Sequence, residues 1–249
     1  MQIKILGNGG AFDEISTSYL INNKIMVDCG QSVVNSLINN DFESKTLDKL
    51  EHLFITHTHS DHINGLESLL YYKSIKNNFK FIENFTIYGT EEVLNYYKSL
   101  AFSQNPLEGG AYYQPFTFKL LHKNYNSSIL VEDCSLHVNY IKAYHMNGTL
   151  NALSFIFVNL HDVENKIIIT GDIDNINKLI SPNLINKKTL LFHDMGWTGL
   201  PKVENKYKFH PTENEVFNYY GKNENIIGIH TSKILKYYKK AKLNKTYII

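Results

Sequence analysis

Seven consecutive residues, THTHSDH at 56–62, constrain this chain more than any other part of its sequence. Four of them carry potential metal ligands: His57, His59, Asp61 and His62. A hydrophobic segment precedes the run and a helical pattern follows it, so we expect these residues on the loop between a buried strand and a helix. At a strand end, residues two apart point the same way, so His57 and His59 can bind one ion together. The turn into the helix directs Asp61 and His62 to another side, where they can bind a second ion.

The ligand types restrict the metal. Neutral imidazoles together with a carboxylate suit zinc, manganese or iron better than calcium or magnesium. An affinity tag or a His-rich surface loop would also supply histidines, but tags are repetitive and terminal, and this run is neither. The sequence therefore predicts two divalent metal ions, with Zn²⁺ in first place and Mn²⁺ as the alternative.

Composition disfavours several classes of partner. The 249 residues carry a net charge of +1, and all 25 basic residues are lysine. This balance does not favour a nucleic acid or an acidic membrane. Any phosphate group must be held by metal, lysine, histidine or backbone N–H, because no arginine is present to form a bidentate clamp.

The other bulk features indicate the cytoplasm. Cys29 and Cys134 lie far apart and form no CxxC pair, which fits a reducing compartment. The sequence enters a strand pattern at once, and no stretch approaches about 18 apolar residues. We therefore expect a soluble cytoplasmic protein, which for a phage-encoded chain means the cytoplasm of the host.

Strand-like and helix-like segments recur along the chain without strict alternation. Strands are expected at 2–6, 18–21, 24–27, 52–56, 85–88, 116–121, 136–143, 152–159, 166–170, 189–193 and 225–229. Helices are expected at 31–39, 63–77, 90–101, 174–180, 212–220 and 232–240. Strand-rich blocks interrupted by single helices predict an α/β fold of two mixed β-sheets packed face to face, with helices outside. Thr90 is expected to cap the helix that it begins. The simplest reading is one domain over residues 1–249.

A loop insertion is expected at about 103–115, where two prolines and a Gly-Gly pair exclude regular structure. Tyr112 and Tyr113 lie within it. They could cover a pocket and stack on a flat ligand. An ordinary loop with packed aromatic residues would have the same sequence.

Three further polar residues follow apolar strand patterns: His145, Asp172 and His230. Loops gather into binding sites at the carboxyl ends of buried strands. Each residue taken singly could be an ordinary polar residue at a strand end. Together with the 56–62 run, they complete a ligand set.

This set resembles that of the metallo-β-lactamase fold superfamily. The HxHxDH run, a later lone histidine, a Gly-Asp after a strand and a late histidine follow in the family's order over nearly the whole chain. The resemblance implies a four-layer αββα sandwich. It also implies that one ion is held by His57, His59 and His145 and the other by Asp61, His62 and His230. Asp172 would bridge the two ions.

The implied chemistry is hydrolysis. Two adjacent divalent ions lower the pKa of a shared water and neutralise charge that grows on a phosphoryl or carbonyl oxygen. Asp61 would orient the attacking water as well as bind metal. The leaving group still needs a proton.

Two later motifs are similar to those of tRNase Z and its relatives, where a His-Glu pair ends a strand and a His-Ser-Thr motif follows. Here His193-Asp194 ends a strand pattern, and His210 begins His-Pro-Thr, 20 residues before His230. Asp replaces Glu and Pro replaces Ser, so the match is partial. We expect His210 to donate a proton to the leaving oxygen or to bind a phosphate oxygen of the substrate. His193 and Asp194 would support that catalytic role or orient the phosphate.

The RNA-gripping arm of bacterial tRNase Z enzymes has no room here. That arm lies between the third histidine and the bridging aspartate, and Asp172 follows His145 by only 27 residues, most of them in two expected strands. The absence of arginine also disfavours a tRNA substrate, because phosphate neutralisation supplies most of such affinity.

Relatives without the arm include the anti-Pycsar enzymes, which degrade cyclic-nucleotide immune signals. The resemblance to them implies hydrolysis of 3′,5′-cyclic nucleotides (cCMP, cUMP, cAMP or cGMP) to linear monophosphates, to defeat antiphage immunity. It also implies a homodimer in which the 103–115 loop covers the nucleobase in cis or in trans. The alternatives are tRNA 3′ processing, hydrolysis of a carboxylic ester, lactone or thioester, and a metal-binding module without catalysis.

Overall fold

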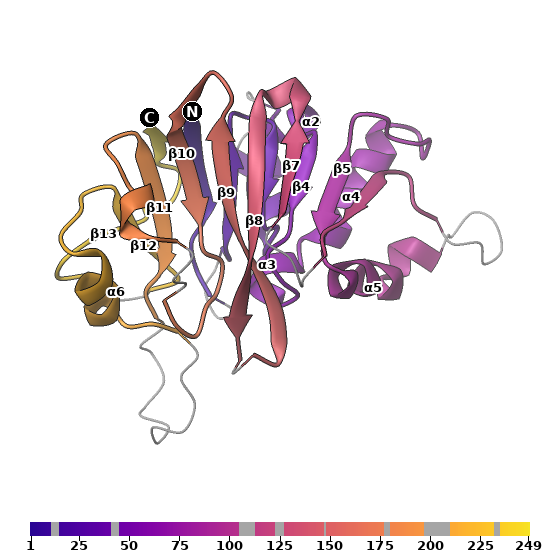
Figure 1. Ribbon diagram of the computed structural model, residues 1–249. Coiled ribbons are helices and arrows are strands. Elements are labelled where there is room, and N and C mark those ends of the chain that lie inside the picture. The colour runs from indigo at the N-terminus through magenta and orange to yellow at the C-terminus, as the bar shows by residue number, and fades with distance from the viewer. Residues whose placement is uncertain are drawn as a thin grey trace.

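Two seven-stranded β-sheets form the body of the protein (Figure 1). The computed structural model describes residues 1–10, 15–40, 45–104, 113–122, 127–146, 148–176, 180–196, 210–231 and 235–249. The first sheet has the order β14-β1-β2-β3-β4-β5-β6 and the second has the order β13-β12-β11-β10-β9-β8-β7. Both are mixed, since each contains parallel and antiparallel neighbours.

The bounds of the elements follow the sequence closely. The first sheet consists of β1 (Gln2–Gly7), β2 (Ser18–Ile21), β3 (Ile25–Val27), β4 (His52–Phe54), β5 (Thr86–Gly89), β6 (Thr117–Leu120) and β14 (Thr246–Ile248). The second consists of β7 (Ser127–Val131), β8 (Leu136–His145), β9 (Leu150–Asn159), β10 (Asp162–Ile169), β11 (Thr189–Asp194), β12 (Ile226–Ile229) and β13 (Lys239–Lys240). The α-helices are α1 (Val33–Asn40), α2 (Thr46–Lys49), α3 (Ser60–Ile63), α4 (Leu66–Lys76), α5 (Glu91–Ser99) and α6 (Glu213–Tyr220). Short 3₁₀ turns are η1 (Ala101–Gln104), η2 (Glu132–Cys134) and η3 (Pro182–Leu184).

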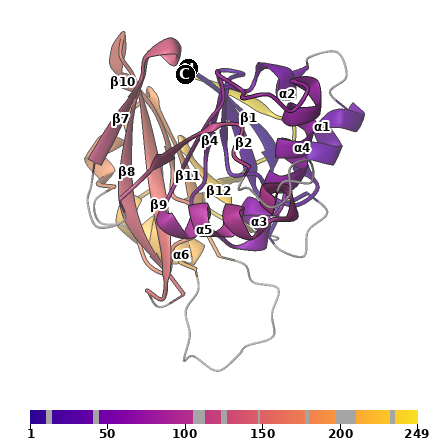
Figure 2. The same cartoon turned by 90° about the vertical axis from the view of Figure 1, so that its right-hand side faces the viewer.

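The layers are held by three main apolar clusters. One lies between the sheets, where Phe54 stacks on Tyr88 at 4.1 Å between ring centroids and meets Phe155 and Phe157 edge-on. A second packs the first sheet against its helices, and a third packs the second sheet against α6. Figure 2 shows α1, α2 and α4 on the outer side of the first sheet. The predicted αββα arrangement of two mixed sheets flanked by helices is confirmed. A core shared by both sheets is what one domain requires, and the bounds 1–249 stay a prediction.

Two predicted helices are wrong where the structure describes them. Residues 174, 175 and 180 form bends, and residue 176 is irregular. In the other segment, residues 235–238 are irregular and residues 239–240 are β13. The cause is tertiary: the backbone N–H groups of 236–238 donate to the Glu213 carboxylate, and β13 pairs in parallel with β12. Such contacts outweigh helix propensity.

Among the described residues, no helix is long and apolar enough to cross a membrane.

Candidate metal centre

The 56–62 run lies in the connection from β4 to α3 and in the first residues of α3, as the pattern predicts. His59 has extended backbone angles and precedes the first turn of α3, which carries Asp61 and His62. His145 ends β8, Asp172 follows β10, and His230 follows β12. Loops from both sheets therefore meet at one end of the sandwich.

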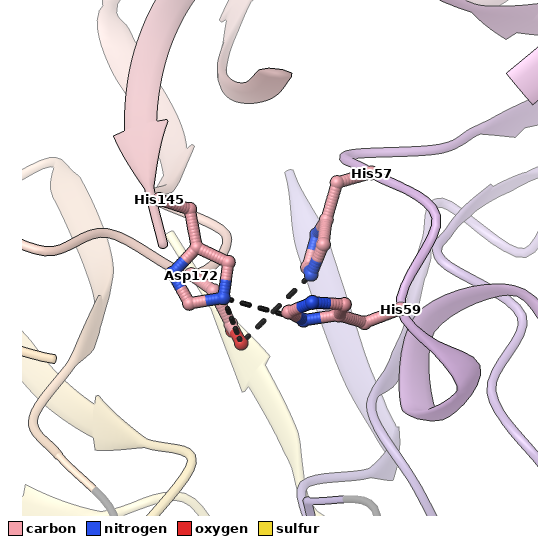
Figure 3. A group of neighbouring side chains, drawn as sticks. All are labelled: His57, His59, His145 and Asp172. Carbon is pink, nitrogen blue, oxygen red and sulfur yellow. Dashed lines mark hydrogen bonds and ion pairs between the residues drawn. The ribbon is translucent and has the colours of Figure 1, made fainter. Parts of the chain in front are cut away.

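One group consists of His57, His59, His145 and Asp172, whose ligand atoms all lie within 4.8 Å of one another. Figure 3 shows the three rings turned toward the carboxylate. His145 Nε2 lies 3.2 Å from His59 Nδ1 and 3.7 Å from Asp172 Oδ2. His57 Nε2 lies 3.9 Å from the same carboxylate oxygen.

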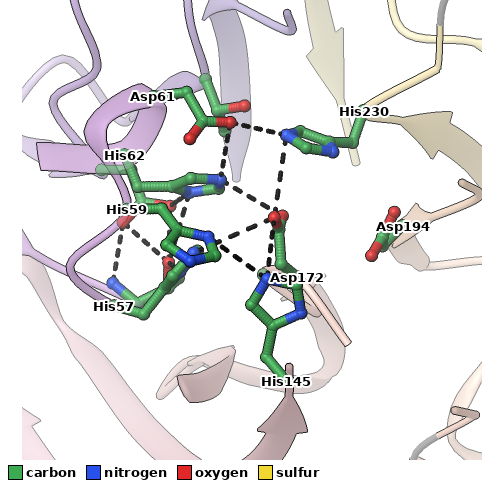
Figure 4. A network of polar contacts seen from close by, with 12 residues as sticks. His57, His59, Asp61, His62, His145, Asp172, Asp194 and His230 are labelled. Atoms are coloured by element: carbon green, nitrogen blue, oxygen red, sulfur yellow. Dashed lines mark hydrogen bonds and ion pairs between the residues drawn. The ribbon is translucent and has the colours of Figure 1, made fainter. Parts of the chain in front are cut away.

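A second group consists of Asp61, His62, Asp172 and His230, again within 4.8 Å. His230 Nε2 lies 2.8 Å from Asp61 Oδ2, and His62 Nε2 lies 3.2 Å from Asp172 Oδ1. Asp172 belongs to both groups, and Figure 4 shows it at the centre of the network. The structure thus brings all seven predicted ligands together, with the aspartate between the two sets.

The residues present fit a pair of divalent ions. His57 Nε2 is buried without a hydrogen-bond partner in the described part of the chain, and His62 Nε2 and Asp172 Oδ1, although 3.2 Å apart, are not joined by a well-oriented hydrogen bond. Buried polar atoms left unpaired are costly, and a cation would satisfy them. Burial also holds the pKa of His57 well below its usual range, which keeps this imidazole in the neutral form that binds metal. The donor set of imidazoles and carboxylates suits zinc or manganese.

Two carboxylates behind the ligands were missed as site residues. Asp28, after β3, lies with Oδ2 2.7 Å from His62 Nδ1. Asp174 Oδ1 lies 3.3 Å from His145 Nδ1. Each faces the ring nitrogen that points away from the proposed ions, and the Asp28–His62 hydrogen bond fixes the tautomer and orientation of the His62 ring. The strand-end criterion that found Asp172 would also have found Asp28.

His210 lies beside both groups. Its Nδ1 is 2.7 Å from Asp194 Oδ2, and its ring centroid is 5.0 Å from that of His230 and 5.4 Å from that of His145. Burial alone would lower the pKa of His210, but the buried Asp194 carboxylate outweighs it and raises the pKa to about 9. In the protein without ions, the ring is then an imidazolium at neutral pH. Since Nδ1 donates to Asp194, Nε2 is the donor left for a substrate.

His193 does not join this centre. Successive side chains of a strand point to opposite faces, so His193 lies on the other side of β11 from Asp194. Its Nδ1 is 2.6 Å from the Asp194 carbonyl oxygen, and its ring packs edge-on against Tyr220 of α6. A catalytic role for His193 stays a prediction and would have to act through Asp194.

Of the two predicted substrate-binding tyrosines, the structure describes only Tyr113. Tyr112 lies outside the described residues. Tyr113 packs against Phe102 in the cluster between the first sheet and its helices, and its hydroxyl donates to the Phe79 carbonyl at 2.9 Å. The structure therefore does not bring Tyr113 to the metal ligands of its own chain.

Solved structures share this fold over the full length of the chain. The metallo-β-lactamase fold protein YhfI from Bacillus subtilis superposes with a TM-score of 0.71 at 16% identity, covering 99% of this chain and 98% of that one. The short form of human tRNase Z superposes with a TM-score of 0.70 at 20% identity, covering 100% and 99%. At these identities the likeness shows the fold alone.

Sequence similarity is more specific. The anti-Pycsar protein Apyc1 of Bacillus phage 010DV004 is 37% identical over 82 residues. That alignment covers 29% of this chain and 29% of the phage protein. The profile of the family described as anti-Pycsar protein Apyc1 matches residues 1–223, which include six of the seven ligands and His210. The chain therefore belongs to the anti-Pycsar Apyc1 family.

Proposed function

We propose that this protein is a metal-dependent phosphodiesterase that hydrolyses 3′,5′-cyclic nucleotides to linear nucleoside monophosphates. The observation that carries the proposal is the His210–Asp194 pair beside two ligand groups that share Asp172. A phosphodiester needs charge stabilisation on its phosphoryl oxygens and a proton for its leaving oxygen, and this arrangement offers both. Membership of the anti-Pycsar family supports the cyclic-nucleotide substrate and action in the cytoplasm of a phage-infected cell.

One divalent ion would be held by His57, His59 and His145. The other would be held by Asp61, His62 and His230. Asp172 would bind both ions. Zinc is proposed as the metal, with manganese as the alternative. Such ions supply a water of lowered pKa and neutralise phosphoryl charge.

The side chains have distinct tasks. In the reaction a water oxygen bonds to phosphorus, the P–O3′ bond breaks, and the 3′ oxygen takes a proton. Asp61 is proposed to orient the attacking water. His210 Nε2 is proposed to donate the proton, with Asp194 holding the ring through Nδ1. Asp194 is itself fixed, because its carboxylate accepts hydrogen bonds from the backbone N–H groups of Ile173 and Gly196.

A small substrate fits the chain better than tRNA. The interval between His145 and Asp172 is occupied by β9 and β10, which continue the second sheet. An RNA-gripping arm therefore has no place in that interval. The 103–115 loop is proposed to cover the nucleobase, in cis or from the partner in a homodimer, and Tyr113, which packs against Phe102, would not do so within its own chain.

The test is an activity assay with cyclic CMP, UMP, AMP and GMP and, separately, with a precursor tRNA. We expect hydrolysis of at least one cyclic nucleotide and intact tRNA. Trimmed tRNA with all four cyclic nucleotides untouched would instead assign RNA 3′ processing.

A His210→Ala variant tests the proton donor. Its kcat is expected to fall about 10²–10⁴-fold, the usual contribution of a positioned acid or base. His122→Ala is the matched control, because it replaces another histidine that belongs to neither ligand group. Unchanged hydrolysis of a cyclic nucleotide by His210→Ala would remove His210 from the role of proton donor. If no cyclic nucleotide is hydrolysed, an ester, lactone or thioester, which does not need this donor, becomes the favoured substrate.

A further inference from the structure

A second kind of ligand cluster lies at the opposite ends of two strands that lead to the metal centre. Glu51 precedes β4 and His52 is its first residue, whereas the 56–62 run follows the same strand. Asp133 and Cys134 belong to η2, immediately before β8, whereas His145 ends that strand. In Figure 1 the turn between β7 and β8 lies at the top of the molecule, and α3 lies toward the bottom.

The four side chains converge. Each offers one ligand atom, and these atoms all lie within 4.8 Å of one another. His52 Nε2 is 2.9 Å from Asp133 Oδ2, and Cys134 Sγ is 3.8 Å from the same oxygen. Ligand atoms about 2.1 Å from a tetrahedral ion stand about 3.4 Å apart, so only small side-chain movements separate this cluster from a coordination shell.

We propose that Glu51, His52, Asp133 and Cys134 bind a further divalent cation of the thiophilic class, zinc being the representative. A thiolate, an imidazole and carboxylates are all ligands that zinc accepts. The sulfur and nitrogen donors disfavour calcium and magnesium, which prefer oxygen ligands. His52 is buried while Asp133 is exposed, so the ring is held in place and an ion can enter from solvent.

The ion pairs in and around the cluster involve Glu51, His52 and Asp133 but not Cys134. His52 pairs with Asp133, and Lys24 Nζ pairs with Glu51 Oε2 at 2.8 Å. Lys24 is 42% exposed and can leave Glu51 for solvent when a cation arrives. Burial and the neighbouring Asp133 carboxylate raise the pKa of the Cys134 thiol to about 12, so the thiol stays protonated at neutral pH. A coordinated cation would remove that proton and turn the thiol into a ligand.

The position gives the ion a structural role. His52 begins a strand of the first sheet, and η2 leads into a strand of the second sheet. A cation bound to both would join the two sheets at the end opposite the metal centre. Hydrolytic activity is not expected to depend on it.

The test uses Co²⁺ on the full-length protein, because a cobalt–thiolate bond absorbs in the near ultraviolet. The chain has two cysteines, so the source of such a band can be assigned. We expect wild-type protein to bind one more Co²⁺ per chain than Cys134→Ser and to show a thiolate band that this variant lacks. Cys29→Ala, the matched control, is expected to retain the band, because Cys29 belongs to neither group of the metal centre.

A second variant, Asp133→Asn, keeps the shape of the side chain and removes its charge. It is expected to weaken the additional Co²⁺ without loss of phosphodiesterase activity. Equal Co²⁺ content in wild type and Cys134→Ser, or a band that disappears in Cys29→Ala instead, would overturn the proposal. Neither result would bear on the proposed hydrolysis, which is assayed separately.

Discussion

Asp28 lies behind His62 and determines how that ring is presented. The carboxylate is fully buried and accepts hydrogen bonds from Thr56 N at 2.7 Å and from the Thr56 hydroxyl. Its second oxygen faces His62 Nδ1, so His62 Nε2 is turned toward Asp172. This is the relation by which an outer carboxylate orients a ligating histidine.

An Asp28→Asn variant is expected to lower metal affinity about 10–100-fold, because the amide keeps the size of the side chain and loses its charge. The measurement is a zinc titration in competition with a chromophoric chelator. Asp162→Asn, which alters an exposed ion pair with Lys188, serves as control. Equal affinities for the two variants would show that Asp28 does not act on the centre.

Lys73 offers a test of stability against pH. It is buried in α4, donates to the Leu50 carbonyl at 2.6 Å and lies over the Phe85 ring. Desolvation lowers the pKa of Lys73 from 10.5 to about 8. Between these values the unfolded chain binds more protons than the folded one, so stability rises as pH increases through this window. Below this pH window, the buried charge of Lys73 lowers the free energy of unfolding by about 3 kcal/mol.

We therefore expect the stability gap between wild type and Lys73→Met to change with pH. Urea unfolding at about pH 7.5 and about pH 10 measures this gap. The contributions of all other titratable groups cancel in the difference between the two proteins. The free energy of unfolding of the wild type should increase relative to that of Lys73→Met at the higher pH. A constant gap would mean that Lys73 keeps its ordinary pKa.

The sequence predicted the residues that the structure brings together in the two ligand groups, but not the carboxylates that contact them from behind, and the reason is physical. The ligands concentrate in one run and at strand ends, where residue type and position are enough. Asp28 follows a strand as Asp172 does, but its contact with His62, 34 residues away, and that of Asp174 with His145 are shown only by the packing of the strands. His193 failed to reach the centre because a strand turns adjacent residues to opposite faces.

At the scale of single elements, the two helix caps provide a matched pair. Thr212 and Glu215 form a capping box at α6, the helix that follows His210. Thr90 precedes α5 in the position of a cap, as predicted, but makes no capping hydrogen bond, and its buried hydroxyl has no hydrogen-bond partner in the described residues.

Replacing each threonine by valine removes the hydroxyl at nearly constant volume. Thr212→Val is expected to cost about 1 kcal/mol of unfolding free energy, because the cap is lost. Thr90→Val is expected to be neutral or stabilising, because it removes an unpaired buried group. Midpoints of urea unfolding give both values, and equal losses would contradict the different roles of the two hydroxyls.

The elements predicted correctly are those with strong apolar patterns, such as β9 and β10. The prediction omitted α2, a single turn, as well as β7 and β14. β7 is an edge strand with mostly exposed residues, and β14 has three residues that pair only with β1. Short or solvent-facing elements have too little hydrophobic periodicity to be predicted from sequence. The segment at 232–240 has a helical pattern, and the Glu213 carboxylate holds its backbone elsewhere.

At the scale of the whole molecule, metal binding at the candidate metal centre is expected to raise the free energy of unfolding. Its ligands come from both sheets, so ions that bind only the folded state should stabilise it. At a free zinc concentration about 100 times Kd, the gain is about 2.7 kcal/mol. Thermal unfolding with zinc and with a chelator measures this gain. Asp172→Asn, which alters the residue shared by both groups, should show a smaller difference.

The ligand pairs are also far apart along the chain. His59 and His145 are separated by 86 residues, and Asp61 and His230 by 169. Bringing such distant residues together in an unfolded chain carries the entropic cost of closing long loops. The sheets must meet before an ion finds its ligands, so metal is expected to bind after the rate-limiting step of folding. Stopped-flow measurements should then show equal refolding rates with and without zinc and slower unfolding with it. Metal would thus determine how long the folded protein lasts rather than how quickly it forms.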